Sequence, residues 1–286
     1  MDKTKIDWCD STWNVVTGCV HDCEYCYARG IANRFGLTYA PKLGDHGMEG
    51  ASKYDSEEQG MDSMLELIKP YIDANGKRNP YPMAFAPTFH RYRLDEYKNK
   101  SGRTIFVCSM ADLFGNWVPD EWLKAVFIAA SKAPQHRYLY LTKNPERYCQ
   151  ISDGDPAIFP DDDDVIGWFG ASASTVEQAE RAYNVEACSW LSIEPIQEDF
   201  EEFCDTMMHY DQKYTMTEMV RWSWIVIGAE TGNRKNKVIP ERSWIENIAK
   251  ACRDAGVPVF MKESLREMMG ADFVQEFPWK GEENDG

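Results

Sequence analysis

Short apolar runs recur along this chain, and many of the intervals between them are long enough for a helix. The runs are residues 83–86, 104–108, 138–141, 166–171, 189–193, 224–227 and 257–260, with a further strand expected at 13–17. Continuous apolar strands that alternate with amphipathic helices predict a parallel sheet covered by helices. We therefore expect an α/β fold, a TIM-like (β/α) barrel that is partial or complete, with a doubly wound open sheet as the second choice.

Three segments have the periodicity of amphipathic helices. The first has Tyr27, Ile31 and Phe35 at four-residue spacing, with Ala28 and Ala32 beside them and Gly36 as a stop. The second begins at Pro119 and is expected to bury Trp122, Leu123, Val126, Phe127 and Ala130. The third is expected to bury Trp244, Ile245, Ile248, Ala249 and Cys252 and to end at Gly256. Each pattern predicts one apolar face that packs on the sheet.

Length and composition predict a single large domain over residues 1–286. With 43% hydrophobic residues, the chain has enough apolar side chains for a large core. Residues 37–80 are irregular and rich in Gly, Lys, Asp and Glu, with an apolar helical patch at 61–68, so we expect an insertion here that could cover the active site. The chain has no 18-residue apolar run and its first residues contain no apolar signal segment, which predicts a cytoplasmic protein.

Three closely spaced cysteines, Cys19, Cys23 and Cys26, carry the clearest chemical signal. Three thiolates bind three irons of a [4Fe-4S] cluster and leave the fourth iron open to an outside ligand. A zinc site would need a fourth ligand, and His21 lies inside the same short loop, where tetrahedral coordination would be strained. A disulfide would need an oxidising compartment. The remaining six cysteines are scattered singly and are predicted to be small buried hydrophobic residues.

In a (β/α) barrel the chemistry lies at the carboxyl ends of the strands, so the polar residues that follow each apolar run are the candidate site residues. These residues are Thr17, Thr88, His90, Ser109, Asp112, Thr142, Lys143, Ser172, Ser174, Ser192, Glu194, Glu230, Thr231, Lys262 and Glu263. Each of them alone could be a capping or loop residue. Together they predict a polar rim at one edge of the sheet.

The spacing of Cys19, Cys23 and Cys26, with Tyr25 and Tyr27 on either side of the last cysteine, resembles the cluster loop of the radical S-adenosylmethionine (SAM) superfamily. The resemblance implies that the amino group and carboxylate of SAM chelate the open iron. It implies that an electron from the cluster cleaves SAM to methionine and a 5′-deoxyadenosyl radical. An electron donor such as flavodoxin or ferredoxin is the protein partner that this chemistry requires.

Longer blocks resemble the phage Gp37/Gp68-type family, a domain of unknown function with such a cluster loop. The blocks are residues 7–8, 12–14, 17–19, 106–114, 141–147, 191–195, 227–232 and 255–262. This layout implies a lyase of queuosine salvage, which releases queuine from queuosine 5′-phosphate. The chain departs from the superfamily pattern in one respect, because no Gly-Gly-Glu motif for the SAM amine follows the second strand. Residues 109–112 occupy that position.

SAM offers an ammonium group, a carboxylate and ribose hydroxyls, and carboxylate, hydroxyl and ammonium side chains suit them. The candidate SAM-binding residues are Ser109, Asp112, Lys143, Ser172, Ser192 and Glu194. Lys143 is assigned to the SAM carboxylate. A structural alternative for Glu194 is an ion pair with a neighbouring lysine.

A nucleotide-like substrate would need cations for a phosphate and an acceptor for a guanine-like edge. The candidate substrate-binding residues are Asn14, Glu230, Arg234, Lys235, Lys237 and Glu263. Arg234, Lys235 and Lys237 form the densest basic group, and a solvated loop is the alternative for them. His90 and Lys262 are the candidate proton donors or bases.

The formal net charge of −16 disfavours binding to long nucleic acids, because their backbone is also negative. We therefore expect a small nucleotide-like substrate. Two alternatives stay open: radical modification of a base within DNA or tRNA, and a non-catalytic zinc or iron-sulfur binding module.

Overall fold

The computed structural model describes residues 4–36, 51–54, 64–154, 167–207 and 222–279 of the chain. Its contacts divide the chain into two compact units, one of residues 1–5 and 9–167 and one of residues 6–8 and 168–286. That all 286 residues form a single domain stays a prediction. Among the described residues, no helix is both long and apolar enough to cross a membrane.

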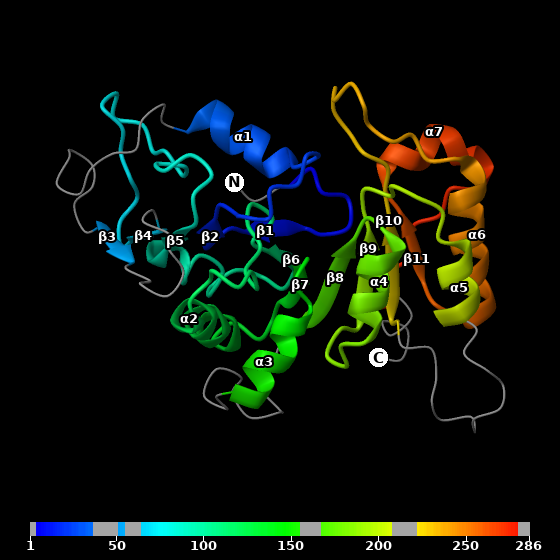
Figure 1. Cartoon of the computed structure of the whole chain (residues 1–286). Coiled ribbons are helices and arrows are strands. Elements are labelled where there is room, and N and C mark those ends of the chain that lie inside the picture. Colours follow the sequence, from blue (N-terminus) through cyan, green and yellow to red (C-terminus); the bar gives the residue numbers. More distant parts are fainter. Residues whose placement is uncertain (1–3, 37–50, 55–63, 155–166, 208–221, 280–286) are drawn as a thin grey trace. The chain divides into compact units, whose positions relative to one another are not determined.

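The first unit includes parallel strands of the larger sheet and the helices that follow them (Figure 1). The strands β1 (Ser11–Trp13), β6 (Thr104–Val107) and β7 (Arg137–Thr142) pair in that order. The helices are α1 (Tyr27–Phe35), α2 (Asp120–Ser131) and α3 (Glu146–Gly154). The core between these elements contains aromatic pairs, such as Phe127 of α2 and Tyr140 of β7 at 5.4 Å between ring centroids.

A second sheet in the same unit has the strand order β2-β5-β4-β3. Its strands are β2 (Val16–Thr17), β3 (Ala51–Tyr54), β4 (Met64–Leu67) and β5 (Thr88–His90), and the short helix η1 (Arg91–Arg93) follows β5 directly. Strand β4 pairs in parallel with β5 and antiparallel with β3.

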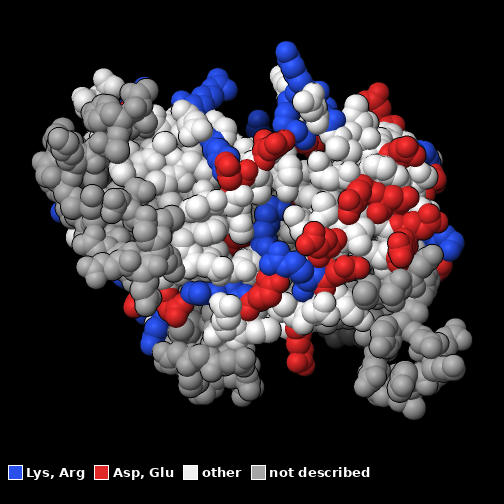
Figure 2. Space-filling model, in the orientation of Figure 1, with Lys and Arg blue, Asp and Glu red and all other residues white. Residues whose placement is uncertain are grey.

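The second unit contains the parallel strands β8 (Trp168–Ala173), β9 (Trp190–Ile193), β10 (Trp224–Ile227) and β11 (Val259–Met261). Its helices are α4 (Val176–Tyr183), α5 (Glu201–Met207), α6 (Arg242–Ala255) and α7 (Arg266–Met269), with short turns η2 (Glu263–Leu265) and η3 (Gly270–Asp272). Figure 2 shows Asp and Glu side chains gathered over the helices of this unit. The first turns of α4 and α5 contribute Glu177, Glu201 and Glu202.

The strand order of the larger sheet is β1-β6-β7-β8-β9-β10-β11, which is the order of the strands along the chain once the second sheet is set aside. Helices connect successive parallel strands, as in a partial TIM-like barrel. The predicted α/β class and the partial barrel are therefore confirmed. The strands predicted at 104–108, 138–141, 166–171, 189–193, 224–227 and 257–260 are confirmed as well.

Two strand predictions and one helix prediction are wrong. Residues 83–86 lie between Pro82 and Pro87 and form turns, in which the Ala84 amide donates to the Tyr81 carbonyl. Proline has no backbone N–H to donate to a neighbouring strand, so the strand begins only at Thr88. The run at 13–17 divides at Asn14 between β1 and β2, which belong to different sheets.

The patch at 61–68 contains strand β4 and no helix in its described part, because β3 and β5 pair with it. Most of the 37–80 insertion lies outside the described residues, so its role as a cover stays a prediction.

The helix predictions hold at the ends of the helices and differ in which side chains are buried. In α6, Ile245, Ile248, Ala249 and Cys252 are buried as predicted, whereas Trp244, in the first turn, is only partly buried. All five side chains expected on the inner face of α2 are buried, and α6 ends at Gly256, whose φ of 70° suits glycine. In α1, however, Ala28 and Ala32 are buried, whereas Tyr27, Ile31 and Phe35 are 54%, 37% and 59% exposed. The small alanines pack close to Phe85 and Met110, and this close approach turns the large side chains outward.

Candidate functional site

The cysteine loop joins β2 to α1 and is fixed by backbone contacts at its first residues. The Gly18 amide donates to the Met110 carbonyl over 2.9 Å, and the Cys19 amide donates to the Phe85 carbonyl over 3.1 Å. Gly18 has a φ of 89°, and a Cβ there would lie 2.2 Å from the Ala86 carbonyl oxygen. Only glycine fits this approach. The loop therefore begins at a fixed point beside β6.

The Cys19, Cys23 and Cys26 thiols are free and partly buried. The pKa of Cys19 is raised to about 12, mainly by burial, with smaller contributions from Asp112, Cys23 and Cys26. Burial also raises the pKa of Cys23, although the nearby Lys143 ammonium opposes the shift. Cys26 caps α1, since its sulfur accepts from the Arg29 amide over 3.3 Å. Three neighbouring thiols are suited to bind a positively charged metal group, which deprotonates its thiol ligands.

Over the described ranges, no three or more His, Cys, Asp and Glu side chains are arranged to hold one metal ion. A zinc ion needs ligands that converge on a single centre, whereas the thiolates of a [4Fe-4S] cluster each bind a different iron. Cys19, Cys23 and Cys26 are the residues of the loop that would hold either group.

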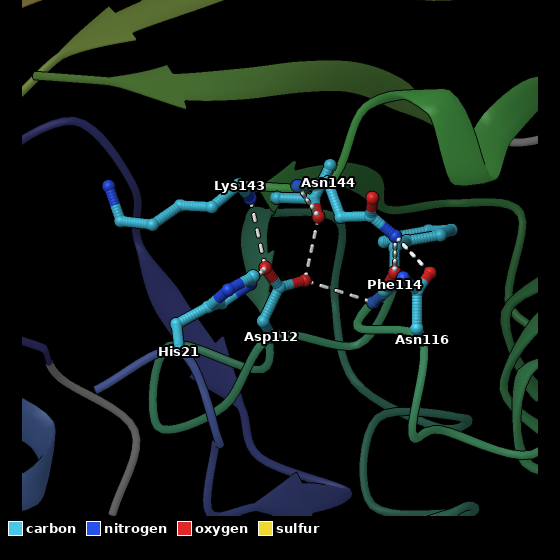
Figure 3. A network of polar contacts seen from close by, with 7 residues as sticks. His21, Asp112, Phe114, Asn116, Lys143 and Asn144 are labelled. Atoms are coloured by element: carbon cyan, nitrogen blue, oxygen red, sulfur yellow. Dashed lines mark hydrogen bonds and ion pairs between the residues drawn. The ribbon is translucent and has the colours of Figure 1, made fainter. Parts of the chain in front are cut away.

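Asp112 is the centre of a polar network beside the loop (Figure 3). The residue is 5% exposed. Its Oδ1 accepts from the Thr142 hydroxyl over 2.8 Å and the Phe114 amide over 3.0 Å, and its Oδ2 accepts from the Lys143 amide over 2.9 Å and His21 Nε2 over 2.7 Å. A carboxylate has about four acceptor positions, and these bonds occupy them. Asp112 was predicted to bind the SAM ammonium, and the structure favours a positioning role instead.

Two further predicted residues, Asn14 and Ser109, are in direct contact. Asn14 Oδ1 accepts from the Ser109 hydroxyl and from the Met110 amide, each over 3.1 Å. The Ser109 carbonyl accepts from the Tyr27 hydroxyl over 2.6 Å. These bonds connect the carboxyl ends of β1 and β6 to the first turn of α1. The structure therefore brings Asn14, Ser109, Lys143 and the three cysteines together in the first unit.

In the second unit, four predicted residues share one face of the sheet. Ser172, Ser192 and Val226 are register partners on β8, β9 and β10, and Glu194 and Lys262 follow two positions after Ser192 and Phe260. Glu194 and Lys262 form an ion pair, which was the structural alternative for Glu194. The pair lies against Gly228, where a Cβ would come within 2.9 Å of the Lys262 side chain. The Ser192 hydroxyl is buried and has no hydrogen-bond partner in the described part of the chain.

Two of the predicted substrate residues of the second unit, Glu230 and Arg234, pair with each other. The Arg234 guanidinium donates to both oxygens of Glu230, each over 2.7 Å, and the Glu230 side chain is only 3% exposed. The hydrogen bond from Arg234 is the main reason that the pKa of Glu230 lies below its ordinary value. This pairing argues against Glu230 as the guanine acceptor and against Arg234 as a phosphate ligand. Lys237 donates to the Gly232 carbonyl over 3.2 Å, and Lys235 is exposed.

Glu263 lies apart from these residues. Its carboxylate is 62% exposed and pairs with Arg266 over 2.6 Å, and its backbone amide donates to Asp7 over 2.8 Å. This exposed position offers no enclosure for a substrate. The substrate role of Glu263 stays a prediction.

The prediction that His90 is a proton donor or base does not fit its position. His90 ends β5 in the second sheet and is 0% exposed. Its Nε2 lies 2.9 Å from the Thr17 hydroxyl and its Nδ1 lies 3.3 Å from the Tyr92 hydroxyl. Burial lowers the pKa of His90 to about 3, with smaller effects of Arg93 and Arg78. The imidazole is a neutral core group, and the error came from the misplaced strand at 83–86.

The sequence analysis did not predict that His21 and Trp117 lie next to the polar network of Asp112. The His21 and Trp117 rings meet edge to face at 4.9 Å between centroids, while His21 also contacts Asp112. Sequence analysis had weighed His21 only as a zinc ligand. The available signal was a histidine between two candidate ligand cysteines, in a chain with a polar residue, Asp112, after one of its predicted strands. The contact itself depends on tertiary structure.

The fold and the site define a parallel α/β protein with a three-cysteine loop beside the carboxyl ends of its first strands. The chain belongs to the family described as "Protein of unknown function (DUF5131)", which matches residues 3–269. Neither the phage-type family name nor queuosine salvage is part of that description. No curated protein was found to match the chain. The structure is similar to that of a spore photoproduct lyase complexed with a dinucleoside spore photoproduct, with a TM-score of 0.49 and 10% identity over 91% of this chain and 79% of that chain.

An Asp112→Asn substitution should lower the free energy of unfolding by about 2 to 4 kcal/mol, because the new amide group would face donors in a buried site. Chemical denaturation measures the change. The matched control is Asp120→Asn, which removes a partner of Arg147 that is 54% exposed and should cost about 1 kcal/mol or less. Equal losses in the two variants would contradict the central role of the Asp112 network.

A Glu230→Gln substitution should lower the free energy of unfolding at pH 7 by on the order of 1 to 3 kcal/mol, because it breaks a buried bidentate ion pair. The folded state lowers the pKa of Glu230, so the pair contributes fully above the ordinary carboxyl pKa. Its contribution is lost as the pH falls below about 4.5 toward the lowered value. Denaturation of both proteins at pH 7 and near pH 4 should show the difference shrinking in acid. A difference that grows in acid would refute the assignment.

Proposed function

We propose that this chain is a radical SAM enzyme in which Cys19, Cys23 and Cys26 hold a [4Fe-4S] cluster. The observation that carries the proposal is the C-x3-C-x2-C loop itself, with free, partly buried thiols beside the carboxyl ends of parallel strands. When bound, such a cluster supplies the electron that cleaves SAM to methionine and a 5′-deoxyadenosyl radical. A protein such as flavodoxin or ferredoxin would deliver that electron.

The residues of the chain would then bind and orient the two small molecules. Lys143 suits the SAM carboxylate, because its ammonium lies near Cys23 and 5.4 Å from the centroid of the Tyr25 ring. Ser109 and Asn14 offer polar groups at the neighbouring strand ends. Ser172, Ser192 and Glu194 are assigned to the hydroxyls and the ammonium of SAM. Lys262, held by Glu194, is the remaining candidate proton donor, since His90 is buried.

The proposed substrate is a small nucleotide-like molecule. The net charge of −16 supports a small substrate over DNA or tRNA, whose backbones the acidic surface would repel. The specific candidate is queuosine 5′-phosphate, from which a lyase would release queuine, and the support for it is the resemblance of the sequence blocks. Incubation of the reconstituted protein with this nucleotide and SAM should yield queuine and 5′-deoxyadenosine. Formation of 5′-deoxyadenosine without queuine would reject queuosine 5′-phosphate as the substrate, and the proposal of a radical SAM enzyme would stand.

A Cys23→Ala substitution should abolish both cluster binding and SAM cleavage, since two remaining thiolates cannot hold three irons of the cluster. The measurement is anaerobic reconstitution followed by iron analysis, for which the wild-type chain should bind about four irons, and by quantification of 5′-deoxyadenosine. The matched control is Cys149→Ala, which removes a partly buried thiol outside the loop and should retain both properties. Full activity of Cys23→Ala would remove the basis of the proposal, as would stoichiometric zinc without SAM cleavage.

A Ser192→Ala substitution should weaken SAM binding by about 3- to 10-fold, the equivalent of one lost hydrogen bond, and leave stability nearly unchanged. The reason is that the Ser192 hydroxyl has no partner in the described part of the chain, so a ligand hydroxyl is the expected partner. Ser189→Ala is the control, because the Ser189 hydroxyl already donates to the Phe169 carbonyl over 3.2 Å. Equilibrium binding and chemical denaturation test both parts. Unchanged SAM affinity in Ser192→Ala would count against this contact.

A further inference from the structure

Two arginines of the first unit contact the same aromatic ring. The Cζ atoms of Arg78 and Arg93 lie 5.0 Å and 5.8 Å from the centroid of the Tyr92 ring. Neither guanidinium forms an ion pair within the described part of the chain. Six other described arginines do have a carboxylate partner: Arg29, Arg91, Arg147, Arg234, Arg242 and Arg266. In a chain with 47 acidic residues, two neighbouring arginines that lack a carboxylate partner among the described residues are candidates for an anion site.

The two guanidiniums also share a second neighbour, the His90 ring. Both reach the neighbourhood of the His90 ring, where each lowers the pKa of the imidazole. The rings of His90 and Tyr92 meet edge to face at 5.6 Å between centroids. Arg93 also lies near the Tyr81 phenol. Burial raises the pKa of Tyr81, and the Arg93 charge partly opposes this shift. Two like charges around the same rings repel each other, and an anion bound close to both would relieve the repulsion.

This basic group lies beside the cysteine loop. Arg93 Nη1 donates to the Asn14 carbonyl over 2.9 Å, and the Arg93 carbonyl accepts from Trp13 Nε1 over 2.9 Å, at the carboxyl end of β1. The Tyr81 side chain packs on the same apolar cluster as Cys19 and Cys26. An anion at Arg78 and Arg93 would therefore lie near the proposed reaction site.

We propose that Arg78 and Arg93, together with Tyr81 and Tyr92, form the binding site for the terminal phosphate of the substrate. The planar guanidinium group donates two parallel hydrogen bonds to phosphate oxygens, and a tyrosine hydroxyl adds a donor. The identity of the substrate as a nucleotide rests on the proposed function, whereas the anion site rests on the geometry. Phosphate binding at Arg234 would instead require displacement of the Glu230 carboxylate.

The test measures binding of guanosine 5′-monophosphate, inorganic phosphate and guanosine to the full chain by calorimetry. Arg78→Ala should weaken binding of both phosphate-containing probes by about tenfold or more, the size of one charged hydrogen bond, and should leave guanosine binding unchanged. Arg78→Lys should recover part of the affinity, because lysine keeps the positive charge but lacks the two parallel N–H donors of the guanidinium group. The matched control is Arg34→Ala, which removes another guanidinium that contacts an aromatic ring, 5.4 Å from the Phe35 centroid, and should change nothing.

Arg93→Ala should weaken phosphate binding similarly, but Arg93 also bonds to Asn14, so circular dichroism must show that this variant is folded. Among the residues that the structure describes, the Arg78 side chain forms no such bond, and its variants therefore decide the test. Absence of phosphate binding by the wild-type chain, or equal affinities of Arg78→Ala and Arg34→Ala, would overturn the proposal. Tight binding of a short single-stranded DNA without binding of the mononucleotide would overturn the assignment to a terminal phosphate. Cleavage of SAM is scored separately, so a failure of the phosphate site and a failure of the radical SAM proposal are distinguishable.

Discussion

The buried carboxylate of Asp112 is the constraint on which the geometry around the cysteine loop depends. Its four hydrogen bonds come from three segments: His21 in the loop, Phe114 after β6, and Thr142 and Lys143 after β7. A buried charge that loses a partner costs several kcal/mol, so the charge is tolerated only when all of these segments are in place. One side chain therefore fixes the loop against the ends of two strands. The same bond to the Lys143 amide fixes the backbone from which the Lys143 ammonium reaches toward Cys23.

The backbone of the loop complements this network from the opposite end. Gly18 permits close contact with Ala86, and Cys26 ends the loop as the cap of α1. Between these points Cys19 and Cys23 are partly buried, and burial raises the pKa of both thiols. The loop is ordered by backbone hydrogen bonds at Gly18 and Cys19 and by the contact of His21 with Asp112. This order is consistent with a site that holds its thiols ready for a cluster.

Much of the fold could be predicted from the sequence because the strands of the larger sheet are continuous apolar runs. The inner face of α2 was also predicted correctly, because the helical spacing of its apolar residues determines which of its side chains are buried. The second sheet was missed because its strands are two to four residues long and gain their structure from pairing. The face of α1 was predicted wrongly because the closest packing there uses alanines, which a count of large apolar residues overlooks.

The candidate site was predictable only in part, for a related reason. Sequence position indicates which residues follow a strand, but it does not indicate which polar groups will pair with each other. Glu230 with Arg234 and Glu194 with Lys262 were assigned to ligands separately, and the structure pairs them. Arg78 and Arg93 belong to no sequence motif, and only the fold brings them to one ring.

The most direct test of the central claim is electron paramagnetic resonance of the reduced, anaerobically reconstituted chain with and without SAM. The central claim is that three thiolates leave one iron open to SAM. The account predicts the signal of a reduced [4Fe-4S] cluster that changes when SAM is added, because SAM binds the open iron directly. A cluster signal that SAM leaves unchanged, or a chain that takes up no iron, would contradict it.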